Sequence, residues 1–176
     1  LDEASLSLSL RYSKPTYGPS QGHMEGTIHK FDYKGYSYRD ITIDTDYSGL
    51  KLNGMLNIND PNGSLNVKGL FDLSDKEKPV LDFEAQAKNI QLDSLRLLEN
   101  MKQSYLSFNI NANFSGKNID ESDGYIKIDS LDFIREDKVF QMQKFLLETS
   151  GMGKDRKLSI KSDIINGEIL GAYSST

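Results

Sequence analysis

The sequence predicts a mostly β protein, a long antiparallel meander that curls strongly, with one short helix near 93–103. Three observations predict it: apolar and polar residues alternate along most of the 176 residues, turn-forming residues separate the alternating runs, and the alternation changes phase at several points. Alternation of period two gives a strand one buried and one solvated face. Such strands are typical of antiparallel sheets, because parallel strands are usually apolar on both faces.

The alternating runs define about eleven strands. Their apolar members are, in chain order, Leu6, Leu8, Leu10 and Tyr12; Leu50, Leu52, Leu56 and Ile58; Leu65, Val67, Phe71 and Leu73; Leu81, Phe83, Ala85 and Ala87; Leu106, Phe108, Ile110, Ala112 and Phe114; Ile126 and Ile128; Leu131 and Phe133; Phe140 and Met142; Phe145 and Leu147; and Leu158 and Ile160.

Short turns join these strands. Asp60-Pro61-Asn62-Gly63 suits a type I turn, because proline presets φ at the second position and glycine accepts positive φ at the fourth. Further turn signals lie at 34–35, 47–49, 121–124 and 151–154. Strands at this spacing predict a meander.

The alternation changes phase at four places, which are Tyr38 to Ile41, Ala87 to Ile90, Ile128 to Leu131 and Met142 to Phe145. One extra residue in a strand is a β-bulge, which bends and twists it. Each slip is therefore either a bulge or a strand end, and repeated bulges would curl the sheet.

Residues 93–103 break the period-two pattern. Leu95, Leu98 and Met101 have helical spacing, Asp93 or Ser94 can cap the start, and Lys102 suits the C-terminal end of the dipole. We expect a helix of two or three turns that covers one end or edge of the sheet.

Composition excludes several classes of function. Lys and Arg number 21 against 26 Asp and Glu, a net charge of −5 with no basic run, which argues against nucleic-acid binding. The absence of Cys excludes disulfides, Cys-ligated zinc and a thiol nucleophile. No apolar run is long enough for a transmembrane helix or signal peptide.

Since Leu1 already opens a strand-like pattern, we expect residues 1–176 to be a single segment of a larger repetitive β protein.

Polar residues form no convincing catalytic or metal constellation, so we expect neither an enzyme nor a metal or cofactor. His23 and His29 would share a face of a strand but lack a third ligand, and surface histidines explain them better. The following groups also have simpler explanations: Asn57, Asn59, Asp60, Asn62 and Gly63 as a hairpin instead of a calcium loop; Asp120, Glu121, Asp123, Asp129 and Asp132 as solvated acids instead of a cation site; and Tyr33, Tyr36, Tyr38 and Tyr47 as strand residues instead of a sugar-stacking platform.

The apolar stripe itself has two interpretations. It is either the core of an ordinary sandwich or the lining of a trough that carries lipid acyl chains. Both remove apolar area from water, worth about 25 cal/mol per Å², and periodicity does not separate them.

Three stretches, 106–133 (LSFNINANFSGKNIDESDGYIKIDSLDF), 159–174 (SIKSDIINGEILGAYS) and 50–73 (LKLNGMLNINDPNGSLNVKGLFDL), repeat one pattern. Strand after strand ends in Gly, continues through Asn-Ile-Asp or a related turn, and restarts. Across nearly its full length the chain resembles a middle section of the translocation and assembly module (TamB) proteins of the AsmA-like superfamily.

The resemblance implies a taco-like open groove or half-barrel with an apolar interior, in the periplasm of a Gram-negative envelope. It implies an inner-membrane anchor and an outer-membrane barrel partner, both reached through other parts of the full protein, and a role in outer-membrane biogenesis and phospholipid transport between the membranes. Acyl chains would contact Leu52, Leu56, Ile58, Leu65, Val67, Phe71, Leu81, Phe83, Phe108, Ile110, Phe114, Ile126, Ile128 and Phe133. The helix at 93–103 has no counterpart in the family and would plug the trough locally.

Two alternatives remain. One is a scaffold that guides outer-membrane protein strands by pairing with the open sheet edges; the other is a plain secreted β-sandwich binding module. If the chain is a segment, its ends should also expose an apolar patch.

Overall fold

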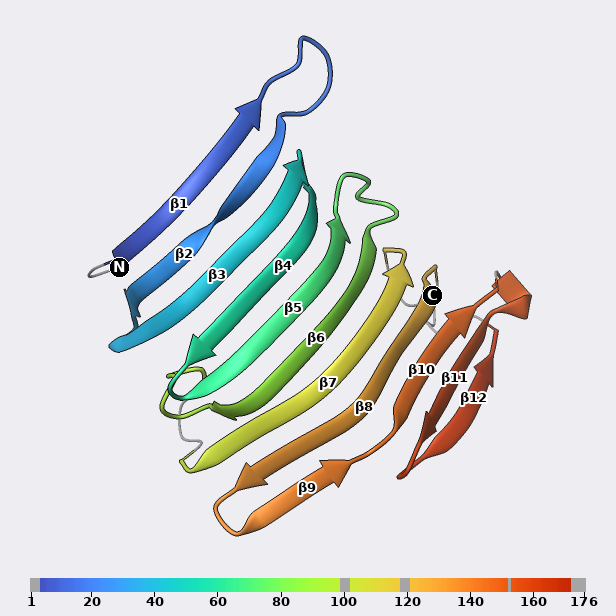
Figure 1. Ribbon diagram of the computed structural model, residues 1–176. Coiled ribbons are helices and arrows are strands. Elements are labelled where there is room, and N and C mark those ends of the chain that lie inside the picture. Colours follow the sequence, from blue (N-terminus) through green and yellow to red (C-terminus); the bar gives the residue numbers. More distant parts are fainter. Residues whose placement is uncertain (1–3, 99–101, 118–120, 152, 172–176) are drawn as a thin grey trace.

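The computed structural model describes residues 4–98, 102–117, 121–151 and 153–171, and its strands form a single antiparallel sheet (Figure 1). The sheet has 12 strands, where the sequence predicted about eleven. They are β1 (Ala4–Ser13), β2 (Gln21–Tyr33), β3 (Tyr36–Ser48), β4 (Lys51–Asp60), β5 (Gly63–Asp72), β6 (Val80–Gln91), β7 (Ser104–Ser115), β8 (Asp123–Arg135), β9 (Lys138–Met142), β10 (Phe145–Ser150), β11 (Lys157–Ser162) and β12 (Asn166–Leu170), with a 3₁₀ turn η1 (Gly153–Asp155).

The strands follow one another in chain order, as in a meander. The exception is β8, which pairs with β9 along its second half and with β10 along its first half. β9 and β10 therefore lie end to end beside β8, and only residues 143–144 separate them. The predicted slip between Met142 and Phe145 is this break.

The predicted turns at 34–35 and 60–63 form hairpins. Lys34 and Gly35 both have positive φ (51° and 75°), as the type I′ connection of β2 and β3 requires. At the second hairpin β4 ends at Asp60 and β5 begins at Gly63, whose φ is 142°. An added Cβ there would lie 2.7 Å from the Cα of Ile90, so glycine is also needed for close packing against β6.

Irregular positions occur in β2, β3, β6 and β8. The β1–β2 ladder skips His29 of β2, and His29 lies opposite Asp40 of β3. Asp40 has a positive φ, and the β3–β4 ladder ends next to it. The β6–β7 register shifts between Ala87 and Ile90 of β6. The β7–β8 register shifts at Asp129 of β8, which has no partner in β7. Three of the four predicted phase changes are therefore distortions within strands, and such distortions bend and twist the strands that contain them.

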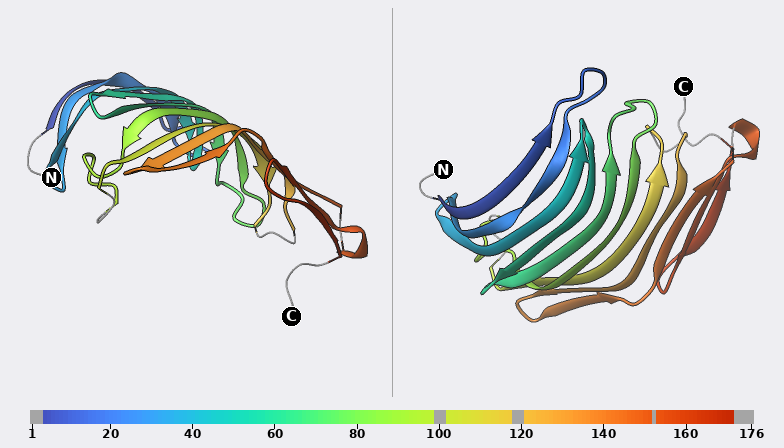
Figure 2. Two further views of the ribbon diagram at one scale, coloured as in Figure 1. Left: turned by 90° about the horizontal axis from the view of Figure 1, so that it is seen from below. Right: turned by 45° about the horizontal axis from the view of Figure 1, so that its top comes forward.

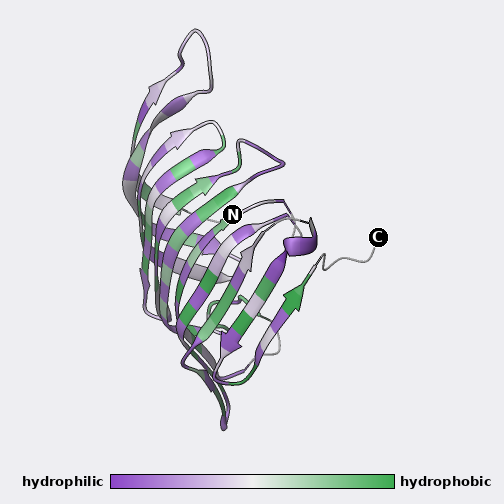
Figure 3. Ribbon diagram, turned by 90° about the vertical axis from the view of Figure 1, so that its right-hand side faces the viewer, coloured by the Kyte–Doolittle hydropathy of each residue, from purple (hydrophilic) through white to green (hydrophobic). Residues whose placement is uncertain are grey.

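The sheet is arched and open (Figure 2). Its two edge strands, β1 and β12, do not pair with each other. Apolar and polar residues alternate along each strand (Figure 3), so one face of the sheet is apolar and the other polar. The predicted open, curled, mostly β meander is confirmed, and the described strands do not form the two packed sheets of a sandwich.

The helix predicted at 93–103 was wrong for the described residues. Residues 92–98 form consecutive turns whose hydrogen bonds run from Leu95 to Gln91, from Arg96 to Asp93 and from Leu97 to Leu92. These spacings of four, three and five residues never repeat, and the φ of +55° at Arg96 interrupts a right-handed helix. Residues 99–101 lie outside the described part, and 102–103 are also a turn.

These turns lie beneath the arch (Figure 2). Leu92 and Leu95 are buried, and the Tyr38 hydroxyl of β3 donates to the Leu95 carbonyl at 2.6 Å. The segment that leaves β6 therefore reaches back past β5 and β4 on the concave side. Because its leucines are buried there, the concave face is the apolar one.

Candidate functional site

The concave face carries all fourteen residues that the sequence assigned to the groove. Cross-strand partners in an antiparallel pair point to the same face, so the register identifies the rows that cross it. They are Leu52–Phe71–Leu81–Phe114; Leu56–Val67–Ala85–Ile110–Ile128; Ile58–Leu65–Ala87–Phe108–Leu131; Phe83–Ala112–Ile126–Leu147; and Leu106–Phe133–Phe140.

These side chains are only partly covered. Thirteen of the fourteen are half-buried, and Leu52 is exposed, at 46%. The fully buried apolar residues of the face are mainly small ones, Ala85, Ala87 and Ala112. Within the described residues no second sheet covers this surface, and the 92–98 turns pack against part of it.

The concave face has a hollow where two glycines face each other. Gly54 of β4 pairs with Gly69 of β5, between the pairs Leu52–Phe71 and Leu56–Val67. The hollow has a volume of about 290 Å³, and Met24 and Ile43 extend its lining onto β2 and β3. An added Cβ at Gly69 would lie 2.5 Å from the Cα of Phe83, so the close approach of β6 excludes a side chain there.

Sequence reasoning missed the part of this face that lies on β2 and β3. Ile41, Ile43 and Tyr47 stand opposite Ile58, Leu56 and Leu52, and so extend the predicted rows by one strand. The signal was present in the alternation of 41–47. In 22–28 two glycines take apolar-face positions and leave only Met24 and Ile28 to mark the run.

The opposite, convex face is polar and held together by side-chain hydrogen bonds. The Gln86 amide donates to Asn109 at 2.8 Å, and Asn109 donates to Ser130 at 2.9 Å. Asn66 likewise donates to Asn57 on the neighbouring strand. These residues alternate with the apolar rows and satisfy one another's hydrogen-bonding groups.

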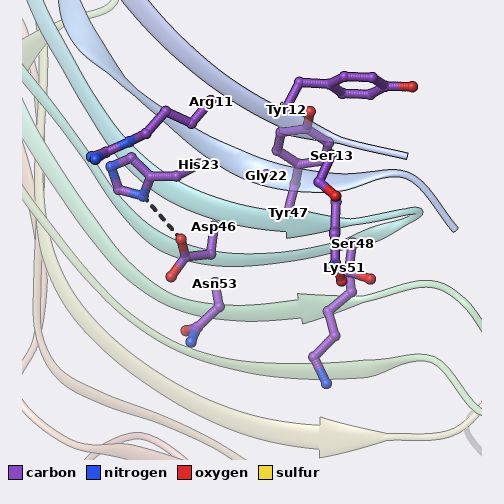
Figure 4. Close-up of a pocket in the computed structure, with 11 residues that line it drawn as sticks. Arg11, Tyr12, Ser13, Gly22, His23, Asp46, Tyr47, Ser48, Lys51 and Asn53 are labelled. Atoms are coloured by element: carbon purple, nitrogen blue, oxygen red, sulfur yellow. Dashed lines mark hydrogen bonds and ion pairs between the residues drawn. The ribbon is translucent and has the colours of Figure 1, made fainter. Parts of the chain in front are cut away.

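His23 is the centre of a charged cluster on this face, of which Figure 4 draws Arg11, His23 and Asp46. Its Nδ1 lies 2.9 Å from Asp46, its Nε2 lies 3.5 Å from Glu25 and 3.6 Å from Asp44, and Arg11 lies 3.6 Å from Glu25. The hydrogen bond to Asp46, with help from the other carboxylates, raises the pKa of His23 above its usual value. Figure 4 draws the mixed polar hollow of about 560 Å³ beside it.

Neither histidine belongs to a metal site in the described part of the chain. No group of three or more His, Asp or Glu residues there has the arrangement to hold an ion. His29 lies 3.4 Å from the Ser7 hydroxyl, away from the His23 cluster. The structure separates the two histidines along β2 and gives each a polar partner.

The asparagine-rich segment 57–63 is a hairpin, as predicted. Asp60 is buried and accepts the Arg39 amide at 3.0 Å, the Asn62 amide at 2.9 Å and the Tyr36 hydroxyl. Its oxygens are occupied by donors from β3 and from the turn itself, and therefore hold the hairpin against β3 instead of presenting a cation site.

The acidic residues of the 120–132 region do not converge. Asp123 pairs with Arg156 at 2.8 Å, Asp129 with Lys127 at 2.7 Å, and Asp132 accepts from Gln141 at 2.8 Å. Asp120 lies outside the described residues.

Arg156 is a buried charged residue that the sequence analysis did not single out. Its side chain is 2% exposed, and its Nη1 donates to Asp123 and to the Gly151 carbonyl, the latter at 2.7 Å. The arginine ties the β10–β11 connection to the start of β8. A buried arginine of this kind stabilises the local fold through charge-assisted hydrogen bonds.

Three of the four tyrosines come together. Tyr36 and Tyr38 meet edge to face at 4.8 Å, and Phe31 lies 6.1 Å from Tyr33 and 6.3 Å from Tyr38, whereas Tyr47 lies at the other end of β3. Burial raises the pKa of the Tyr36 and Tyr38 hydroxyls. The cluster packs the β2–β3 hairpin end.

Among the residues that the structure describes, no helix has the length and apolar character needed to cross a membrane. In the comparisons with known proteins, no family model, no curated protein and no solved structure matches this chain.

Proposed function

We propose that this chain is a non-catalytic segment of a periplasmic, TamB-like envelope protein, and that its concave face carries phospholipid acyl chains between the inner and outer membranes. In this proposal the full protein holds the membrane anchor and meets an outer-membrane barrel partner through other segments. The proposal includes support of outer-membrane biogenesis and no contact with nucleic acid.

The observation that carries the proposal is the continuous apolar face of an open, single-layered sheet. The rows through Ile110 and Phe108 extend from β3 across β8 without a charged side chain. A globular core would cover such a face with a second layer, because exposed apolar area is unfavourable by about 25 cal/mol per Å². An acyl chain laid along the rows would gain the same free energy.

The dimensions of the face suit hydrocarbon. The hollow at Gly54 and Gly69, about 290 Å³, is about twice the ~150 Å³ cavity that accommodates a benzene ring. It therefore has room for roughly a dozen carbon atoms, which is part of one acyl chain. Its lining offers such a chain almost no polar group, so the proposed contact is not specific for a headgroup.

A photo-crosslinker placed on each face tests the proposal in cells. At Ile110, on the concave face, it should capture phospholipid. At Asn109, one residue away on the convex face, it should not. Equal lipid labelling at the two sites would refute the proposal. Crosslinks to nascent barrel proteins from β1, with none to lipid from Ile110, would favour strand guidance at the sheet edge instead.

A charge substitution tests transport. Ile128→Asp places a carboxylate among the apolar rows, where an uncompensated charge in contact with hydrocarbon costs several kcal/mol. It should block lipid transfer. The matched control is Ser130→Asp on the convex face, which should transfer normally. Both variants should keep the β circular-dichroism spectrum, and transfer by Ile128→Asp at the control rate would contradict the assignment.

A further inference from the structure

The concave face is closed at one end of the strands and open at the other. Leu92 and Leu95 are buried at the closed end, where the 92–98 turns pack against the face. At the opposite end the next pair beyond Leu52 and Phe71 is Leu50 and Leu73, which a backbone hydrogen bond of 3.1 Å links. These two leucines are 60% and 48% exposed. Figure 1 shows the connections that carry them at the upper ends of β3 to β6. An apolar ligand therefore has access from this end and is stopped at the turns.

The length of the face along β4 and β5 suits one phospholipid molecule. From Asp72, beside the open end, to Leu65, in the row of the buried Ala87, β5 advances by seven residues, which is about 24 Å. Half of a bilayer, with its headgroup region, is about 20–23 Å thick. The hollow at Gly54 and Gly69 lies between these two points. An extended acyl chain would therefore reach from the open end to the turns with its middle in the hollow.

The open end offers cations to an anionic headgroup. Asp75, in the connection between β5 and β6, accepts the backbone amides of Glu77 and Lys78 at 2.9 and 3.3 Å. Glu77 forms an ion pair with Lys117 at 2.6 Å. Lys76 and Lys78 are exposed, and neither forms an ion pair within the described part of the chain. Two such ammonium groups beside an apolar entrance favour a ligand that is both negatively charged and amphipathic.

We propose that the concave face binds phospholipids with an anionic headgroup in one orientation. The headgroup lies at Lys76 and Lys78, and the acyl chains point along β4 and β5 toward the 92–98 turns, where Leu95 sets their inner limit. The proposal rests on the proposed function, because it requires that the face bind acyl chains, and it adds a headgroup class and a direction. Headgroup selectivity comes from the open end, outside the apolar hollow.

Tryptophan fluorescence tests the orientation, since the chain has no Trp of its own. Leu73→Trp reports on the open end and Leu65→Trp on the closed end; Leu65 lies in β5, and Leu73 directly follows this strand on the same face. Each variant is incubated with vesicles of brominated phosphatidylglycerol, which are then removed by centrifugation. Bromine near the headgroup should quench Leu73→Trp several-fold more than Leu65→Trp. Bromine near the chain end should reverse this order.

The quenching pattern separates failure of the orientation from failure of lipid binding. Equal quenching of both variants by both lipids, or the opposite order, would overturn the orientation while lipid binding stands. If neither variant is quenched and the protein fraction holds no lipid, the proposed function fails too. Phe108→Trp, an aromatic exchange in the same row as Leu65, provides a second reporter of the closed end. Far-UV circular dichroism checks that the sheet of each variant is intact.

Lipid retention from mixed vesicles tests the headgroup site. The unmodified chain should retain phosphatidylglycerol over phosphatidylcholine by about five- to tenfold, because each exposed lysine contributes a few-fold. Lys76→Gln/Lys78→Gln should retain the two lipids equally. The matched control, Lys102→Gln/Lys138→Gln, removes two exposed lysines at the opposite end of the strands and should keep the preference. Equal retention by the unmodified chain, or a preference that survives in Lys76→Gln/Lys78→Gln, would refute the headgroup site.

Discussion

The close packing around Gly54 on the concave face predicts a large effect of one added methyl group. In Gly54→Ala the new Cβ would lie 2.2 Å from the Asp44 carbonyl oxygen and 2.4 Å from the Cα of Thr45. Both atoms belong to the backbone of β3, so neither can rotate away. An ordinary carbon–oxygen approach is about 3.3 Å, and β3 and β4 must therefore separate locally by about 1 Å.

The cost follows from this displacement. Overpacking of one methyl group costs about 1–3 kcal/mol, and stretching the ladder beside it weakens a hydrogen bond worth about 1 kcal/mol. We expect Gly54→Ala to lower the free energy of unfolding by about 3 kcal/mol. The matched control is Gly167→Ala in β12, where nothing lies within 4 Å of the added Cβ. There alanine should stabilise the strand by about 0.5–1 kcal/mol.

Urea unfolding measures both variants. The midpoints should differ while the slopes stay equal, because the surface exposed on unfolding is unchanged. If Gly54→Ala falls within about 0.5 kcal/mol of Gly167→Ala, then β3 and β4 are not held as closely as the structure shows, and the origin assigned to the hollow is wrong.

Three further predictions concern the polar contacts. Because Asp46 raises the pKa of His23, the stability gained from the protonated imidazole is complete below the ordinary pKa of 6.5 and is lost as the pH rises through the higher folded value. The urea midpoint should therefore fall across that range, and His23→Gln should remove this part of the pH dependence; an unchanged profile would contradict it. Arg156→Ala should destabilise by about 3 kcal/mol through loss of buried charge-assisted hydrogen bonds, measured as a thermal midpoint, and a shift no larger than that of an exposed Lys→Ala variant would count against this. Tyr38→Phe removes the donor to the Leu95 carbonyl and should cost about 1 kcal/mol, with faster amide exchange at 92–98; protection equal to the unmodified chain would show that this bond does not hold the turns.

The error at 93–103 has a clear physical cause. Leu95 and Leu98 have helical spacing, yet Leu95 is buried under the arch while Leu98 is exposed. The Asp93 carboxylate, expected as a helix cap, instead accepts the Gln103 amide at 3.0 Å, which closes the connection and lowers the pKa of Asp93. The local helix preference of this segment is weak. Packing of Leu95 against the concave face and closure of the short β6–β7 connection therefore determine its conformation.

The phase changes located irregular positions in the strands, but the sequence did not separate bulges from strand ends. Whether the slip at Ala87 was a bulge or a strand end depended on the partner strand, because a bulge exists only relative to a register. β7 continues past it, so it is a bulge. At Met142 the same kind of slip is a break, since β8 there exchanges β9 for β10.

The sequence by itself determined the strand class, the turns and the membership of each face, because period-two alternation and turn chemistry are local properties. It placed Phe108 and Asn109 on opposite faces without knowledge of any partner strand. Only the tertiary structure decided that the sheet stays open, that its apolar face is the concave one, and that Gly54 and Gly69 meet to form a hollow. Those features depend on register and on the summed bends of many strands, which no local pattern contains.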